Sequence, residues 1–83
     1  MTTTFKDRSV IITGAGKGIG RACTIELAKR GARIVAIART QSDLDTLSEL
    51  TGCVSIIADL ADTAAAREAM QEAGCCDYLI NCA

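Results

Sequence analysis

The sequence of 83 residues contains no histidine and no proline. Histidine is the commonest metal-ligating side chain and the commonest general base, so its absence argues against a histidine-bound metal centre and against imidazole catalysis. The apolar runs are only a few residues long, whereas a helix that crosses a bilayer needs about 20. We therefore predict no metal site and no membrane span. Proline-rich, repetitive and low-complexity tracts are also missing, so we expect no linker.

Charge of one sign is not in excess, because nine Lys and Arg side chains oppose ten Asp and Glu, for a net charge of −1. A protein that binds nucleic acid over a broad surface needs a strong basic excess, so we expect no nucleic-acid partner. Apolar residues make up 49% and charged residues 23%, as in a globular domain. The first residues include no apolar segment of a secretory signal, so we expect a cytoplasmic protein.

Five cysteines are present, and no two of them form a Cys-x-x-Cys motif. The spacing of cysteines that is typical of zinc sites and redox sites is therefore absent, which argues against both kinds of site. The odd number favours free thiols in a reducing compartment, most of them acting as small buried apolar side chains. The five are Cys23, Cys53, Cys75, Cys76 and Cys82.

Four short apolar runs alternate with three stretches of helical periodicity. Most of the runs are continuous rather than alternating, which is typical of parallel strands covered on both faces. Because crossovers between parallel strands are right-handed, the order β-α-β-α-β-α-β predicts an α/β fold with a parallel sheet. The runs lie at 10–12, 34–38, 54–58 and 78–80, and the helical stretches at about 19–30, 41–50 and 63–73.

Each helical stretch has an apolar face and start or stop signals. A glycine follows each stretch, at positions 31, 52 and 74, where helices commonly end. Asp62 is a candidate N-cap, Thr40 with Asp43 resembles a capping box, and Glu26 with Arg30 forms an i,i+4 pair. The expected apolar faces are Ile19, Ala22, Cys23 and Leu27, then Leu44, Leu47 and Leu50, then Ala66, Ala69, Met70 and Ala73.

The candidate ligand site is the segment Thr-Gly-Ala-Gly-Lys-Gly-Ile-Gly-Arg at 13–21, between the first strand and the first helix. Glycines let backbone N–H groups approach a pyrophosphate, and the positive end of the following helix attracts the anion. A Walker A loop needs Ser or Thr after Gly-Lys, and G-x-G-x-x-G needs glycine at position 19, which is Ile19. The spacing present is Thr-Gly-x-x-x-Gly-x-Gly, on Thr13, Gly14, Gly18 and Gly20.

This spacing resembles the cofactor loop of the short-chain dehydrogenase/reductase family. Two later landmarks of that family follow in order, Asp59-Leu60 after the third strand and Asn81-Cys82-Ala83 after the fourth, with Cys82 where the family usually has Asn. The loop and the segments 38–41 and 43–45 are similar to the dicarbonyl/L-xylulose reductase branch. The resemblance covers the whole chain. It implies a Rossmann-type parallel sheet of strand order 3-2-1-4, the N-terminal part of a larger doubly wound domain.

The resemblance also implies roles for particular residues. Asp59 would bond the adenine amino group, and Leu60 would supply a backbone contact. Asn81 would brace the central strands and touch the adenine-side ribose. The loop residues that would hold the cofactor are Gly14, Gly16, Lys17, Gly18, Ile19 and Gly20.

The choice between the two nicotinamide cofactors depends on the end of the second strand. An NAD site usually has a carboxylate there that accepts hydrogen bonds from the ribose hydroxyls. No Asp or Glu lies between Glu26 and Asp43. Arg39 stands there instead and could bind a 2′-phosphate, with Lys17 as a second cation and Thr40 as a hydroxyl donor. We therefore predict NADP(H).

No catalytic residue is predicted within these 83 residues. The family's Ser and its Tyr-x-x-x-Lys pair lie well downstream, and Tyr78 is followed four residues later by Cys82, so Tyr78 is interpreted as a packing residue. We expect residues 1–83 to be an incomplete NADP(H)-binding Rossmann domain, the N-terminal third of a homo-oligomeric, usually tetrameric, NADPH-dependent carbonyl reductase of α-dicarbonyls and ketoses. A stand-alone dinucleotide-binding module is the alternative, and methyltransferase use of a similar sheet is a weaker one. A downstream Tyr-x-x-x-Lys would decide between the first two.

Overall fold

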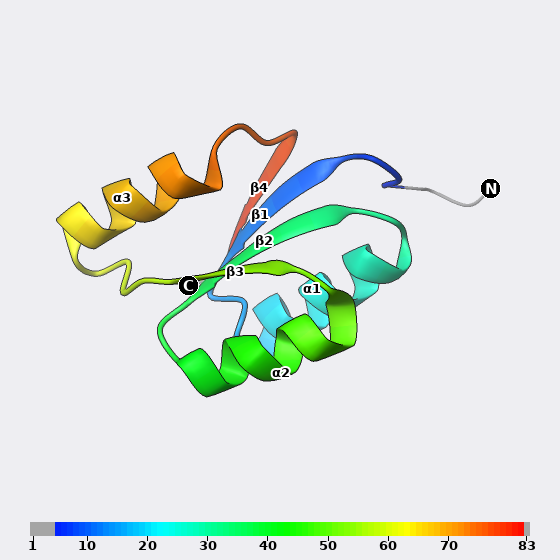
Figure 1. Cartoon of the computed structure of the whole chain (residues 1–83), viewed down its shortest axis with the longest axis horizontal. Coiled ribbons are helices and arrows are strands. Elements are labelled where there is room, and N and C mark those ends of the chain that lie inside the picture. Colours follow the sequence, from blue (N-terminus) through cyan, green and yellow to red (C-terminus); the bar gives the residue numbers. More distant parts are fainter. Residues whose placement is uncertain (1–4, 83) are drawn as a thin grey trace.

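The computed structural model describes residues 5–82 and contains four strands and three helices in strict alternation (Figure 1). This order confirms the predicted α/β fold, with every element boundary within one or two residues of its expected place. The elements are β1 Ser9–Thr13, α1 Gly18–Lys29, β2 Arg33–Ala38, α2 Gln41–Thr51, β3 Val54–Ile57, α3 Thr63–Ala73 and β4 Tyr78–Asn81.

The four strands form one parallel sheet in the order β3-β2-β1-β4, which confirms the expected order. Strands β2 and β3 lie on one side of β1 and strand β4 on the other, so the order in which the strands are added reverses at β1. Thr13 of β1 lies beside Ile37 of β2 on one side and Asn81 of β4 on the other. In such a sheet the loops that follow the strands meet at one edge, and ligands bind where the strand order reverses. The segments after β1, β2 and β3 therefore meet at the end of the sheet where the strands finish, and this is the end that can hold a ligand.

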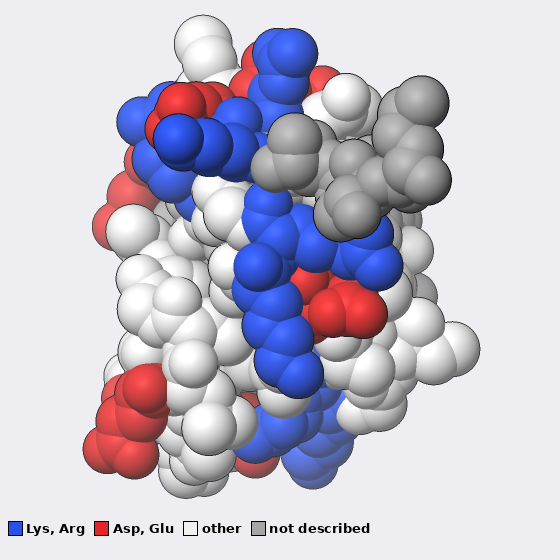
Figure 2. All heavy atoms as spheres, turned by 90° about the vertical axis from the view of Figure 1, so that its right-hand side faces the viewer, with Lys and Arg blue, Asp and Glu red and all other residues white. Residues whose placement is uncertain are grey.

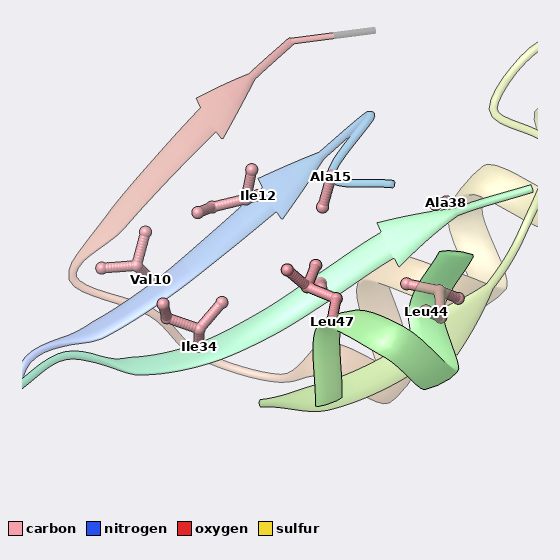
Figure 3. Close-up of a cluster of buried hydrophobic side chains, with 8 residues drawn as sticks. Val10, Ile12, Ala15, Ile34, Ala38, Leu44 and Leu47 are labelled. Carbon is pink, nitrogen blue, oxygen red and sulfur yellow. The ribbon is translucent and has the colours of Figure 1, made fainter. Parts of the chain in front are cut away.

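Helices α1 and α2 cover one face of the sheet, and α3 lies on the other (Figure 1). On the first face, Leu44 and Leu47 of α2 are fully buried against β1 and β2 (Figure 3). On the second face, Ala69 of α3 packs on Ile37 and Ile56. The two clusters contain alternate residues of β1 and β2, which explains why both strands are continuously apolar.

Two of the three predicted helix faces need correction. In α1, Ile19 is 77% exposed and Ala22 is also exposed, while the buried residues are Gly20 and Thr24. Leu27, which was predicted, packs against the first core cluster together with Ile25 and Ala28, so the contact face of α1 is shifted from the predicted one and only partly coincides with it. In α2, Leu50 is 61% exposed, because six residues at 100° each place it about 120° around the helix from Leu44. Of the face predicted for α3, Ala69, Met70 and Ala73 belong to or pack on the second core cluster, and Ala66 is half-buried.

The predicted helix ends are mostly confirmed. Asp62 is the N-cap of α3 and its Oδ1 accepts hydrogen bonds from the backbone N–H groups of Ala64 and Ala65. The glycines at 31, 52 and 74 all have positive φ. The capping box expected at Thr40 is wrong, because this residue is the N-cap of α2 but makes no side-chain cap bond.

The cysteines and the fourth strand depart from a fully packed core. All five cysteines are free thiols, but none is buried, and Cys75 and Cys76 are exposed, so the expectation of buried cysteines is wrong. Cys75 and Cys76 lie in the connection between α3 and β4. Strand β4 has one neighbour, β1, and its Leu79 is 54% exposed. Tyr78 packs edge-on against Phe5, with ring centroids 5.9 Å apart.

The end of the sheet where the strands begin carries charges of both signs (Figure 2). There Arg33 donates a hydrogen bond to the backbone oxygen of Asp7 at 3.3 Å. Near the carboxyl end of α1, Glu26 and Arg30 pair at 3.7 Å, as expected. Within residues 5–82, no helix combines the length and apolar character of a membrane span.

Candidate functional site

A pocket of about 330 Å³ opens at the carboxyl ends of β1, β2 and β3, where the loops after these strands meet. Seven of the eleven residues predicted for cofactor binding line it. They are Gly14, Gly16, Lys17, Arg39, Thr40, Asp59 and Leu60. The other lining residues are Ile37, Ala38, Asp43, Ala58 and Ala61.

The glycine loop forms one wall of the pocket and leads directly into α1. Gly14 and Gly18 have φ angles of 64° and 56°, a left-handed conformation that L side chains rarely adopt. Lys17 is the N-cap of α1 but provides no side-chain cap bond, and the first turn contains no acidic residue. The first backbone N–H groups of α1 are therefore left for an external acceptor, and an anion is the acceptor that the helix end favours.

Gly20 is required by the packing of the loop against its own helix. A Cβ atom at this position would overlap the backbone carbonyl group of Gly14, which comes directly after β1. Thr24, one turn later, is fully buried and donates a 2.8 Å hydrogen bond to the Gly20 oxygen. Gly20 thus holds the start of α1 against the end of β1 and lies behind the pocket rather than on its lining.

Two cations face the pocket from different elements. Lys17 belongs to the glycine loop, and its side chain is 81% exposed. Arg39 follows β2 directly, is exposed, and takes part in neither of the ion pairs found in residues 5–82. Thr40, next to Arg39, has a hydroxyl that is not used to cap α2. The lining therefore carries two cations and a hydroxyl that can bind an anion, together with two carboxylates, Asp43 and Asp59.

Asp43 is the residue that the sequence argument missed as a site residue. It lies in the first turn of α2 and lines the pocket, where its Oδ2 is 4.0 Å from Nζ of Lys17. A carboxylate was expected at the end of β2 itself, whereas Asp43 lies five residues later, in the first turn of α2. The sequence did contain a signal for Asp43. A helix that begins shortly after a strand places its first turn at the carboxyl end of that strand, where ligands bind.

Asp59 serves the local turn and still faces the pocket. Its Oδ1 accepts a 3.0 Å hydrogen bond from the backbone N–H of Ala61, and its backbone oxygen accepts one from Asp62. The Asp59 side chain therefore stabilises the turn after β3 and also lines the pocket. Leu60 lies beside it on the lining and packs against the cluster under α3.

Four predicted site residues lie outside the pocket lining: Gly18, Ile19, Gly20 and Asn81. Asn81, at the end of β4, accepts a 2.7 Å hydrogen bond from the Thr13 hydroxyl, so its side chain does link the two strands. Ala83, the last residue of the fourth-strand motif, lies outside the described residues. Residues 5–82 contain no group of three side chains able to hold a metal ion.

Comparison with known proteins identifies the family. A family model described as short chain dehydrogenase matches residues 8–83. The chain belongs to the short-chain dehydrogenase family. The chain is 47% identical over 75 residues to L-xylulose reductase from Mesocricetus auratus, which covers 89% of this chain and 31% of that protein.

Two further relatives agree with this assignment. Carbonyl reductase [NADPH] 2 from Sus scrofa is 42% identical over 82 residues, covering 98% of this chain and 34% of that protein. The crystal structure of L-sorbose reductase from Gluconobacter frateurii, complexed with NADPH and L-sorbose, superposes with a TM-score of 0.86 at 29% identity. That match covers 100% of this chain and 35% of the other. The chain thus spans about a third of the length of the relatives it matches.

Proposed function

We propose that residues 1–83 are the NADP(H)-binding part of a longer, cytoplasmic, homo-oligomeric reductase. Its substrates would be small carbonyl compounds such as α-dicarbonyls and ketoses, L-xylulose among them. The observation that carries the proposal is the meeting of Lys17 and Arg39 in one pocket beside the glycine loop of a short-chain dehydrogenase. The names of the relatives support a reductase that uses NADPH, and the pocket supports the same cofactor independently.

The residues present fit a dinucleotide phosphate. The uncapped start of α1 offers backbone N–H groups to the pyrophosphate, and Gly16 has no Cβ to narrow the pocket. Lys17 and Arg39 would hold a 2′-phosphate, with Thr40 as a hydroxyl donor. Asp59 and Leu60 would contact the adenine, and Asn81 would lie beside the adenine-side ribose. When bound, NADPH supplies the hydride that reduces the carbonyl carbon.

We assign no catalytic residue within this chain. Tyr78 is at the amino end of β4, the opposite end of the strand from the pocket edge, and its ring packs on Phe5. In the longer reductase that we propose, residues outside this segment would supply the proton donor for the carbonyl oxygen.

Calorimetric titration of the full-length protein with NADPH and NADH tests the proposal. We expect NADPH to bind more tightly, by about ten- to a hundredfold for each charge-assisted contact to the 2′-phosphate. Arg39→Asp should remove most of that preference. Arg67→Asp, an equal charge change at an exposed position of α3, should leave it intact. Equal affinities of the unmodified protein for the two cofactors would contradict the proposal.

A further inference from the structure

Asp43 is held between the glycine loop and the start of α2 rather than standing free in solvent. Its side chain is only 27% exposed, and its Oδ2 lies 4.0 Å from Nζ of Lys17. A Cβ atom placed on Gly16 would come within 3.0 Å of the Cβ of Asp43. The absence of a side chain at position 16 is what makes room for this carboxylate. A negative charge is thus built into a pocket whose other charged lining residues are Lys17, Arg39 and Asp59, and Asp43 is the carboxylate paired with Lys17.

We propose that Asp43 determines how strongly the pocket discriminates between a ribose 2′-phosphate and a ribose 2′-hydroxyl. It is the counter-ion of Lys17, so a 2′-phosphate has to displace it from that cation. It also repels the phosphate directly. Asp43 thereby reduces the preference for NADP(H) over NAD(H) that Lys17 and Arg39 create. The inference rests on the proposed function, because it concerns the same pocket.

The short distance between Asp43 and Lys17 makes the repulsion effective. Oδ2 of Asp43 lies 4.0 Å from Nζ of Lys17, well within the Debye length of about 8 Å at physiological ionic strength. A phosphate bound to Lys17 is therefore near enough to the Asp43 carboxylate for salt to screen their repulsion only partly. An uncharged 2′-hydroxyl meets no such repulsion.

The position of Asp43 in its helix adds to the effect. The amino end of a helix carries a partial positive charge, and an acidic residue in the first turn offsets it. Asp43 is the acidic residue in the first turn of α2, the helix that begins next to Arg39 and Thr40. Removing the charge of Asp43 would leave both Lys17 and the positive end of α2 available to a phosphate. Each of these two effects would strengthen the binding of a ribose 2′-phosphate.

The test compares Asp43→Asn with Asp45→Asn in the full-length protein. Asp45 lies on the same helix, is exposed, and accepts a 2.6 Å hydrogen bond from Gln41 away from the pocket lining. Both variants change the net charge equally. Calorimetric titrations with NADPH and NADH are expected to show that Asp43→Asn tightens NADPH by about three- to tenfold and leaves NADH nearly unchanged. Asp45→Asn should leave the ratio of the two affinities as it is.

The deciding quantity is the ratio of NADPH to NADH affinity in the Asp43 variant, relative to the Asp45 variant. An unchanged or lower ratio would overturn the inference, and so would an equal gain for both cofactors. A ratio of one in the unmodified protein overturns the proposed function instead, and the change between the two variants still decides the role of Asp43. Should Asp43→Asn fail to fold, Asp43→Ser removes the same charge with a residue that suits the start of a helix.

Discussion

The hydroxyl of Thr13 donates a 2.7 Å hydrogen bond to the side-chain oxygen of Asn81, and this bond joins the carboxyl ends of β1 and β4. Thr13 is only 4% exposed whereas Asn81 is exposed, so the bond is partly buried. The backbone N–H of Cys82 also donates to the Thr13 oxygen at 3.2 Å. The two strands are therefore fastened at the edge of the sheet that carries the pocket, where the strand order reverses.

Thr13→Val should lower the free energy of unfolding by about 0.5–1.5 kcal/mol, because Asn81 loses a donor while the volume and strand propensity at position 13 stay nearly constant. Thr13→Ser keeps the hydroxyl and should lose less. Denaturant unfolding of the full-length protein measures both values. A Thr13→Val variant as stable as the unmodified protein would show that the bond contributes nothing.

Gly20→Ala should destabilise the protein more than Gly52→Ala. A Cβ on Gly20 would overlap backbone atoms of Gly14, which cannot move without shifting the loop. A Cβ on Gly52 has no atom within 4 Å, so that change costs only the left-handed conformation, about 1–2 kcal/mol. Thermal melts compare the two variants, and similar melting temperatures would contradict the proposed close packing of α1 on the loop.

The fold was predictable from sequence because each of its determinants is local. Continuous apolar runs predict buried parallel strands, and Asp62 predicts the start of α3, where it caps two N–H groups. The faces of α1 and α2 were less predictable, since the contact at Gly20 depends on how closely two segments approach and not on hydrophobicity. Leu50 shows the same limit, because a leucine every third residue drifts around a helix.

The site was predictable where it depends on a loop motif, and less so where it depends on proximity. The glycine loop and Arg39 are at the pocket because both follow strands of one parallel sheet. Asp43 is at the pocket because Gly16 leaves space beside it, a relationship between residues far apart in sequence. Spacing along a chain does not reveal such a contact.

Asp62→Ala should cost about 0.5–2 kcal/mol of stability, because two backbone N–H groups of α3 lose their acceptor. Asp62→Asn retains a side-chain oxygen and should cost less. Chemical denaturation provides the comparison. Asp62 does not line the pocket, so cofactor affinity is expected to stay unchanged in both variants, and a loss of affinity with full stability would contradict this purely structural role.

The isolated chain of residues 1–83 should self-associate through β4. This strand is paired on one side only, and Leu79 is 54% exposed on it, so an open edge and an apolar side chain coincide. Leu79→Lys places a charge on that edge and should shift the chain toward monomer. Leu50→Lys makes the same change at a residue that is 61% exposed on helix α2 and not on β4, and it should have a smaller effect.

Sedimentation velocity over a range of concentrations, with thermal melts to confirm folding, separates these cases. A monodisperse, cooperatively melting monomer of the unmodified chain would contradict the expected association and would favour a stand-alone module. Equal effects of the two lysine substitutions would show that general solubility, rather than the β4 edge, controls association. Because an edge is blocked by a charge on the strand itself, the Leu79 variant is expected to be monomeric at concentrations where the Leu50 variant still associates.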